Sequence, residues 1–227
     1  MDGSVTQLEI DQRIFDLYDE YCHGGIDRRT FLTRAAAVTV GGLAMAQALM
    51  PRYARAQTIS FTDERIVARY VNYPSPGGNS GTMRGYLVAP KGKGPFPVVL
   101  VIHENRGLNP YIEDVARRLA TENFVAFAPD ALTPAGGYPL GDEEKAAAMF
   151  SKLDPKKRDE DLFAAKPFLQ GRPEVNGKIG VVGFCFGGGV ANNYAVRFPD
   201  LAAAVPYYGA QPSAADVAKI KAPLLIH

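Results

Sequence analysis

Cysteine and histidine are scarce in this sequence, and neither sign of charge is in excess. Lysine and arginine total 25 against 24 for aspartate and glutamate, which excludes the basic surface typical of nucleic-acid binding. The two cysteines and three histidines form no cluster with metal-ligand spacing. A phosphate-binding loop and a Gly-x-Gly-x-x-Gly dinucleotide fingerprint are also missing. We therefore expect no metal, no cofactor and no nucleic-acid partner.

The composition is that of an ordinary folded protein. Of the 227 residues, 47% are hydrophobic and 22% are charged, which suits one globular catalytic domain with a normal core. No internal repeat or low-complexity segment interrupts the sequence.

The first 56 residues differ in kind from the rest. An arginine pair within Asp27 to Thr33 precedes a weakly apolar, charge-free run from Ala35 to Met50, and the triplet Ala54 to Ala56 follows. This order resembles a twin-arginine export signal with a small-residue cleavage site, and the run is short for a membrane span. A membrane anchor or an amphipathic core helix is the alternative. We expect the twin-arginine translocation machinery to export residues 57–227 to the periplasm.

Export would leave Cys185 as the only cysteine, because Cys22 lies in the predicted signal. No internal disulfide is then possible. A buried free cysteine is usually a small hydrophobic residue. A lone thiol in an oxidising compartment nevertheless calls for a reason, and catalysis supplies one.

Strand-like and helical patterns alternate along the predicted mature chain. The predicted strands are 65–73, 83–89, 98–102, 124–128, 179–182, 201–208 and 223–226, and the first two flank a turn-rich loop as an antiparallel hairpin. The predicted helices begin at Asn109-Pro110, span 142–153 and 158–169, and run from the glycine-rich turn to Arg197. This alternation predicts the α/β class, with a mostly parallel sheet covered by helices on both faces.

The segment from Lys178 to Val190 carries the chemistry. It predicts a strand, a sharp Gly-x-Cys-x-Gly turn and a helix, and small residues at Gly183 and Gly187 let such a turn close. Cys185 would stand at the helix N-terminus, where the helix dipole and backbone N–H groups favour the thiolate. We predict that Cys185 is the nucleophile for an acyl carbon and that the Phe186 N–H helps to bind the oxyanion.

The loop that follows the strand 98–102 is the expected source of a second oxyanion donor. The backbone N–H of Asn105 is the candidate. His103, Tyr138 and Tyr208 are further candidates for residues of the substrate pocket.

Four separated motifs resemble the dienelactone hydrolase family of α/β-hydrolases, over essentially Ile59 to His227. They are Val101 to Asn109, Ala128-Pro129-Asp130, Gly183 to Gly188 and Tyr207-Tyr208-Gly209. The resemblance implies an α/β-hydrolase fold and hydrolysis of carboxylic esters or lactones by a cysteine nucleophile, here Cys185. It also implies that Glu104 pairs with the resting thiol and assists its deprotonation.

The sequence departs from the family pattern at Pro134. Dienelactone hydrolases that act on chloroaromatic breakdown products carry at this place an arginine that holds the substrate carboxylate, so dienelactone itself is not the expected substrate. His103 precedes the elbow, whereas α/β-hydrolases follow the order nucleophile, acid, histidine. We therefore expect His103 to pack the loop or line the pocket, and Asp130 to have a structural role.

A second departure is at the C-terminus. In the family the catalytic aspartate and histidine follow the strand with which this sequence stops, and His227 lacks the long loop that would carry a base to Cys185. We expect a chain truncated before its C-terminal strand and helix, with little activity of its own.

Two alternatives stay open at the level of the sequence. One is a non-catalytic remnant without a triad. The other is a glutamine amidotransferase, which also uses a cysteine in a Gly-x-Cys-x-Gly elbow. Export and the Glu104 loop argue against the latter. The sequence does not specify the substrate or the oligomeric state.

Overall fold

The computed structural model describes residues 13, 14, 17, 26, 28–39, 42, 58–60, 62–140 and 142–227. The chain divides into two compact units, residues 1–56 and 57–227. In the first unit, helix α2 (Arg28–Val38) contains the arginine pair of the predicted signal. The predicted cleavage site at Ala54 to Ala56 lies outside the described residues. None of the helices described is both long and apolar enough to cross a membrane.

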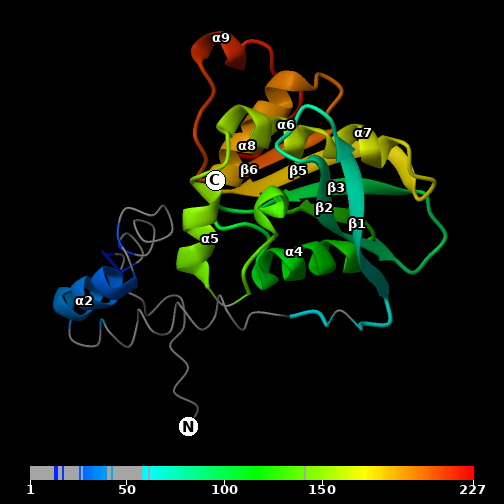
Figure 1. The fold of residues 1–227 in the computed structure, drawn as a ribbon. Coiled ribbons are helices and arrows are strands. Elements are labelled where there is room, and N and C mark those ends of the chain that lie inside the picture. The colour runs from blue at the N-terminus through cyan, green and yellow to red at the C-terminus, as the bar shows by residue number, and fades with distance from the viewer. Residues whose placement is uncertain are drawn as a thin grey trace. The chain divides into compact units, whose positions relative to one another are not determined.

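The second unit is built on a six-stranded mixed sheet (Figure 1). Its strand order is β1-β2-β4-β3-β5-β6. The strands are β1 (Ile66–Ser75), β2 (Gly81–Pro90), β3 (Phe96–Ile102), β4 (Val125–Pro129), β5 (Val175–Phe184) and β6 (Ala203–Tyr207).

The sheet combines an antiparallel edge with a parallel centre. β1 and β2 form the predicted hairpin, in which Tyr73 pairs with Met83, and β2 pairs antiparallel with β4. The pairs β4/β3, β3/β5 and β5/β6 are parallel. The carboxyl ends of β3, β4, β5 and β6 therefore lie at one edge of the sheet, where loops carry function in open α/β folds.

Helices cover both faces of this sheet, as predicted. The helices are α4 (Pro110–Thr121), the short 3₁₀ turn η2 (Thr133–Ala135), α5 (Glu143–Phe150), α6 (Pro155–Phe163), α7 (Ala165–Gln170), α8 (Phe186–Arg197) and α9 (Ala214–Val217). α4 packs on β2, β3 and β4, whereas α8 packs on β5 and β6 from the other face, where α6 and α7 also lie (Figure 1).

The core lies on both sides of β3, as its continuous apolar run predicts. Leu100 and Ile102 belong to one hydrophobic cluster with Val190 of α8. Val101 belongs to a second cluster with Ile112 of α4. Because successive strand residues point to opposite faces, one strand serves both cores.

The start of α4 follows the predicted capping pattern. The Asn109 side chain accepts a hydrogen bond from the Ile112 N–H, and Pro110 occupies the first turn. The predicted helix 158–169, in contrast, is two helices, α6 and α7, and α6 begins earlier than predicted. Asp154 caps it by accepting the Lys157 N–H, and Pro155 fixes its first turn.

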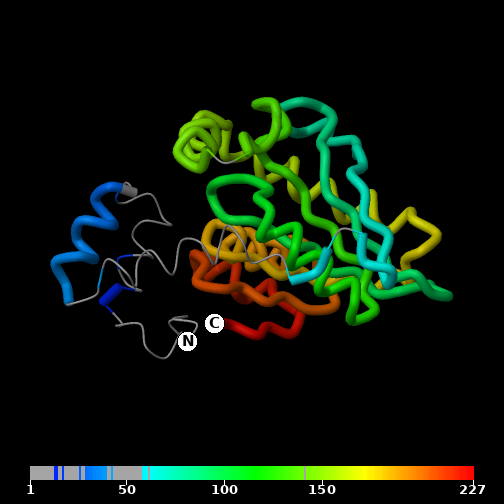
Figure 2. Tube along the Cα trace, turned by 90° about the horizontal axis from the view of Figure 1, so that it is seen from below, coloured from blue at the N-terminus to red at the C-terminus, as the bar shows by residue number. Residues whose placement is uncertain are grey.

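The predicted strand 223–226 is only partly formed. Leu224 makes a single parallel bridge to Ala204. The His227 N–H donates to the carbonyl of Pro206, and the Tyr208 N–H donates to the carbonyl of His227. The segment thus runs beside β6 (red beside orange in Figure 2) without being a regular strand.

Candidate active site

Cys185 stands between β5 and α8 in a strained backbone conformation. Its φ is 54° and its ψ is −116°, and it is the N-cap residue of α8. Positive φ costs a residue with a Cβ atom about 1–3 kcal/mol and persists where the surroundings enforce it. The side chain is only 5% exposed. The predicted elbow is therefore present, with a thiol at its apex.

Glycines make this elbow possible, which confirms the prediction for Gly183 and Gly187. A Cβ atom on Gly183 would lie 1.9 Å from the carbonyl oxygen of Gly187. A Cβ atom on Gly187 would lie 2.3 Å from the carbonyl oxygen of Ile102, in β3. Side chains at either position would push α8 away from the strand ends and open the turn.

A main-chain hydrogen bond ties the elbow to β6. The Cys185 N–H donates to the carbonyl of Tyr207 over 3.0 Å. Phe186 is the first residue of α8, where a backbone N–H has no acceptor within its own helix. Such a donor at the positive end of a helix can bind a developing oxyanion, which is the predicted role of the Phe186 N–H.

The predicted residues Glu104 and Tyr208 come together in space. The Tyr208 hydroxyl donates a hydrogen bond to Oε1 of Glu104 over 3.3 Å. Glu104 is 5% exposed, and Tyr208 has a positive φ of 39°. Since Tyr208 directly follows Tyr207, which binds the elbow N–H, this carboxylate belongs to the same strand-end region as Cys185.

His103 is completely buried, and both ring nitrogens bind the main chain. Nε2 accepts the Ala131 N–H over 3.1 Å, so Nδ1 carries the proton and donates to the carbonyl of Glu104. Burial lowers the pKa of His103, which favours this neutral form. The ring joins the Glu104 loop to the loop after β4 and offers no nitrogen to Cys185.

Asp130 has the structural role predicted for it. Its Oδ1 accepts the N–H groups of Leu108 and Leu132, and its Oδ2 accepts the N–H of Tyr138. Tyr138 is half-buried, and burial raises the pKa of its phenol to about 12. Asp130 thus holds the loop that carries Tyr138 against the loop after β3.

Asn105 follows Glu104, and its side-chain oxygen accepts a hydrogen bond from Nη1 of Arg106 over 2.9 Å. Its backbone N–H stays a predicted oxyanion donor. Arg106 itself is buried and lies 3.9 Å from the Glu143 carboxylate at the start of α5. Sequence reasoning missed this cation, although it is two residues from Glu104 within the same motif.

Sequence reasoning also missed a cluster of aromatic rings around the elbow. The ring of Phe186 meets that of Phe150 edge to face at 4.9 Å, and the guanidinium of Arg158 lies over both. These residues come from α8, α5 and α6. No local sequence signal brings them together.

Comparison with known proteins identifies the second unit. Residues 83–227 match the family model described as Dienelactone hydrolase family. The chain belongs to the dienelactone hydrolase family. Cys185, Glu104 and Tyr208 all lie within the matched part. Residues 1–39 match a second model, described as YqhI-like.

Several curated relatives of this chain carry hydrolase names. A protein of Methylorubrum extorquens provisionally named carboxymethylenebutenolidase is 31% identical over 80% of this chain and 62% of its own length. One of Escherichia coli K12 with the same name is 35% identical over 65% of this chain and 54% of its own length. A shorter Escherichia coli K12 protein, provisionally named a hydrolase fragment, is 54% identical over 50% of this chain and 96% of its own length. The chain thus spans little more than half the length of the two carboxymethylenebutenolidase relatives.

Solved structures of dienelactone hydrolases share the fold. One from Klebsiella pneumoniae has a TM-score of 0.54 at 28% identity and covers 70% of this chain and 72% of its own. A dienelactone-hydrolase-like promiscuous phosphotriesterase from metagenomic libraries has a TM-score of 0.59 at 30% identity, over 71% of this chain and 68% of its own.

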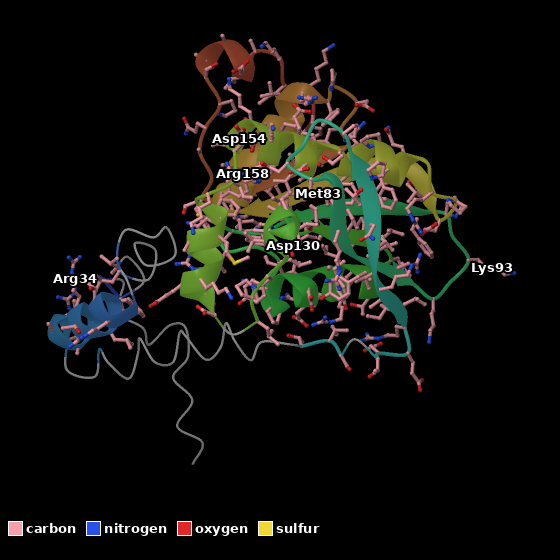
Figure 3. All side chains as sticks on the ribbon, in the orientation of Figure 1. Arg34, Met83, Lys93, Asp130, Asp154 and Arg158 are labelled. Atoms are coloured by element: carbon pink, nitrogen blue, oxygen red, sulfur yellow. The ribbon has the colours of Figure 1, made fainter. Side chains whose placement is uncertain are left out.

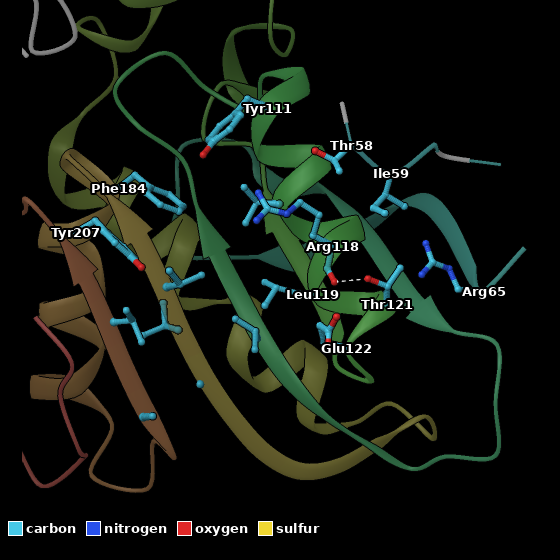
Figure 4. Close-up of a pocket in the computed structure, with 17 residues that line it drawn as sticks. Thr58, Ile59, Arg65, Tyr111, Arg118, Leu119, Thr121, Glu122, Phe184 and Tyr207 are labelled. Atoms are coloured by element: carbon cyan, nitrogen blue, oxygen red, sulfur yellow. Dashed lines mark hydrogen bonds between the residues drawn. The ribbon is translucent and has the colours of Figure 1, made fainter. Parts of the chain in front are cut away.

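This member of the dienelactone hydrolase family also has a cavity of about 790 Å³ on the α4 side of β3, β5 and β6 (Figure 4). Its lining includes Tyr111, Val182, Phe184, Val205 and Tyr207. Neither Cys185 nor Glu104 is among the lining residues, so the cavity is separate from the candidate nucleophile. Within the described part of the chain, no three His, Cys, Asp or Glu side chains are grouped to hold a metal ion.

Proposed function

We propose that this protein hydrolyses carboxylic esters or lactones with Cys185 as the nucleophile. The observation that carries the proposal is the strained elbow, which places a cysteine at the N-terminus of α8, in the same strand-end region as the buried carboxylate of Glu104 and the Tyr208 hydroxyl that binds it. A lone buried cysteine needs no positive φ, whereas a nucleophile that must project from a strand end does.

The first step is attack on the acyl carbon. Glu104 takes the proton of the Cys185 thiol, and the thiolate sulfur forms a bond to the carbonyl carbon of the substrate. The tetrahedral oxyanion is bound by the N–H of Phe186, with the N–H of Asn105 as the second donor. Collapse breaks the ester C–O bond, and the proton held by Glu104 passes to the leaving oxygen.

The second step returns the enzyme to its starting state. Water attacks the thioester carbon and gives one proton to Glu104, and the carboxylic acid leaves as the C–S bond breaks. That proton goes back to the sulfur of Cys185. The sum is one ester and one water converted to one acid and one alcohol.

The substrate class is supported by the names of relatives. Besides the carboxymethylenebutenolidases, a Bradyrhizobium protein provisionally named 2-oxo-3-(5-oxofuran-2-ylidene)propanoate lactonase is 35% identical over 59% of this chain. Tyr138 and Tyr208 are proposed neighbours of the substrate, whereas His103, predicted to pack the loop or line the pocket, is completely buried and packs the loop. Pro134 stands where the resemblance would place a carboxylate-binding arginine, so we propose a lactone or ester other than dienelactone.

We further propose that the protein works in the periplasm and is a client of the twin-arginine translocation machinery. The support is the arginine pair at the start of α2, followed by a charge-free run and a small-residue triplet. Export in the folded state would mean that the elbow buries the Cys185 thiol before the protein reaches the oxidising periplasm.

The test is turnover of p-nitrophenyl acetate by the full 227-residue chain. We expect slow hydrolysis, in keeping with the low activity predicted for this chain from the sequence, and a further fall of at least about tenfold in Cys185→Ala. Cys22→Ala is the matched control, since Cys22 is the one other cysteine in the sequence, and it should keep the wild-type rate. Equal rates in the wild type and Cys185→Ala, or no turnover in either, would contradict the proposal. Release of ammonia from glutamine at a higher rate would favour the amidotransferase alternative.

A further inference from the structure

Arg158 of α6 reaches the nucleophile elbow through an aromatic ring. Its Cζ lies 4.3 Å from the centroid of the Phe186 ring and 4.6 Å from that of Phe150. Both distances are within the range of cation–π attraction. Phe186 directly follows Cys185, so this guanidinium contacts the side chain of the residue next to the candidate nucleophile.

The cluster continues to the loop that carries Glu104. The ring of His103 meets Phe150 edge to face, with centroids 6.3 Å apart. His103 in turn binds the carbonyl of Glu104 through Nδ1. Arg158, Phe186, Phe150 and His103 therefore join α6, the elbow, α5 and the loop after β3 in one continuous contact.

The charge of Arg158 is poorly compensated. Its side chain is 15% exposed, and its buried Nε has no hydrogen-bond partner. The carboxylate nearest to it belongs to Asp159, whose Oδ1 lies 3.8 Å from Nη2, beyond hydrogen-bond distance. Burial lowers the pKa of Arg158 and raises that of Asp159. A guanidinium still keeps its proton, so Arg158, labelled in Figure 3, stays positively charged at this partly buried position.

The elements next to the elbow and Arg158 carry other ionisable groups. They are His103, Glu104 and Arg106 on the loop after β3, Asp130 and Tyr138 on the loop after β4, Glu143 on α5, Asp154 and Asp159 on α6, and Tyr208 after β6. Among them, Arg158 is the one whose charge rests on the ring that adjoins Cys185.

We propose that Arg158 is a positioning residue, whose charge on the Phe186 ring stabilises the Cys185 thiolate and holds the first turn of α8 in place. A nearby cation favours a thiolate, and water screens a charge less when the side chain is largely withdrawn from solvent, as that of Arg158 is at 15% exposure. The inference rests on the proposed role of Cys185 as a nucleophile.

The test is the pH profile of Cys185 alkylation by iodoacetamide, measured on the full chain in a Cys22→Ala background, so that one thiol reacts. In Arg158→Met we expect the midpoint of the profile to rise by about one pH unit. Arg158→Lys keeps a cation and should retain most of the wild-type reactivity. Arg197→Met is the matched control, because Arg197 also lies over an aromatic ring, 4.9 Å from Phe163, but pairs with Glu160. It should leave the midpoint unchanged.

A profile that coincides with the wild type in Arg158→Met would overturn the proposal, and so would an equal shift in Arg197→Met. Should Arg158→Met show no cooperative melt by circular dichroism, Arg158→Gln replaces it. An unshifted profile, or loss of folding in this variant too, would show a purely structural role. Alkylation needs no turnover, so a shifted profile without ester hydrolysis would support the Arg158 inference and count against the proposed function alone.

Discussion

At Cys185 the chain adopts a backbone conformation that residues with a side chain avoid. The cost is offset locally, since the Cys185 N–H binds the carbonyl of Tyr207 and the glycines at 183 and 187 avoid the clashes that Cβ atoms would make at those two positions. The same contacts hold the backbone of Cys185 in one conformation. A nucleophile whose backbone is fixed in this way does not have to be positioned again for each turnover.

His103 makes stability depend on pH. Burial lowers the pKa of His103 below its ordinary value of 6.5, so in weak acid the unfolded chain binds a proton that the folded chain does not. The free energy of unfolding of the second unit should therefore be at its full value above pH 6.5 and decrease as the pH falls below it, by up to about 1.4 kcal/mol per pH unit.

Urea unfolding of the wild type and His103→Gln between pH 8 and pH 5 would measure this effect. The glutamine can still donate to one carbonyl and accept one N–H, but it does not titrate. We expect the free energy of unfolding of His103→Gln to depend less on pH, because the contribution of His103 to that dependence is removed. If the unfolding free energies of the two proteins changed equally with pH between pH 8 and pH 5, this explanation would be wrong.

The first turn of helix α8 packs so close to the end of β3 that there is no room for a Cβ atom at Gly187. Gly187 faces the carbonyl of Ile102, where a Cβ atom would approach to 2.3 Å, whereas a Cβ atom on Gly189 would meet Ala210 at 3.4 Å, an ordinary contact. Both glycines lie in α8. Alanine substitutions at the two positions therefore separate the effect of a steric clash with β3 from the effect of helix propensity.

Gly187→Ala should destabilise the fold by about 2–4 kcal/mol and slow both ester hydrolysis and thiol alkylation, because the first turn of α8 must shift. Gly189→Ala should be neutral or stabilising by up to about 1 kcal/mol, since alanine favours a helix over glycine. Thermal unfolding and thiol alkylation rates, measured for both variants, test these two expectations. Similar losses in both would indicate that helix packing at β3 is not the determining contact.

Elements with local signals were predictable from the sequence, and contacts between distant segments were not. The hairpin of β1 and β2, the two-sided strand β3, the Asn109 cap and the elbow all follow from turn residues, periodicity or glycine spacing within a few positions. The early start of α6 had a local signal as well, in Asp154 and Pro155, and the prediction overlooked it. The Arg158 cluster had none, because its residues come from separate helices that the sequence pattern does not bring together.

The two units of the chain differ in what they are predicted to do. The second carries the family match and the candidate site, whereas the first carries the predicted signal. If the signal works, it should act through its paired arginines rather than through its total charge.

Expression of the full chain with Arg28→Lys and Arg29→Lys together should abolish its appearance in the periplasmic fraction. The control is Arg34→Lys, which changes another arginine of α2 and should leave export unchanged. Immunoblots of periplasmic and cytoplasmic fractions measure both. Undiminished periplasmic protein in the double variant would contradict twin-arginine export.

The end of β6 acts as a mechanical link between the elbow and the segment beside it. Tyr207 accepts the Cys185 N–H, and the N–H of the next residue, Tyr208, binds the carbonyl of His227, whose ring stacks on Tyr207 at 4.5 Å. Two main-chain hydrogen bonds, joined by the peptide bond between Tyr207 and Tyr208, thus connect His227 to the residue that carries the sulfur. A displacement of the segment beside β6 would therefore shift the carbonyl that holds the Cys185 N–H, and with it the backbone that aims the nucleophile.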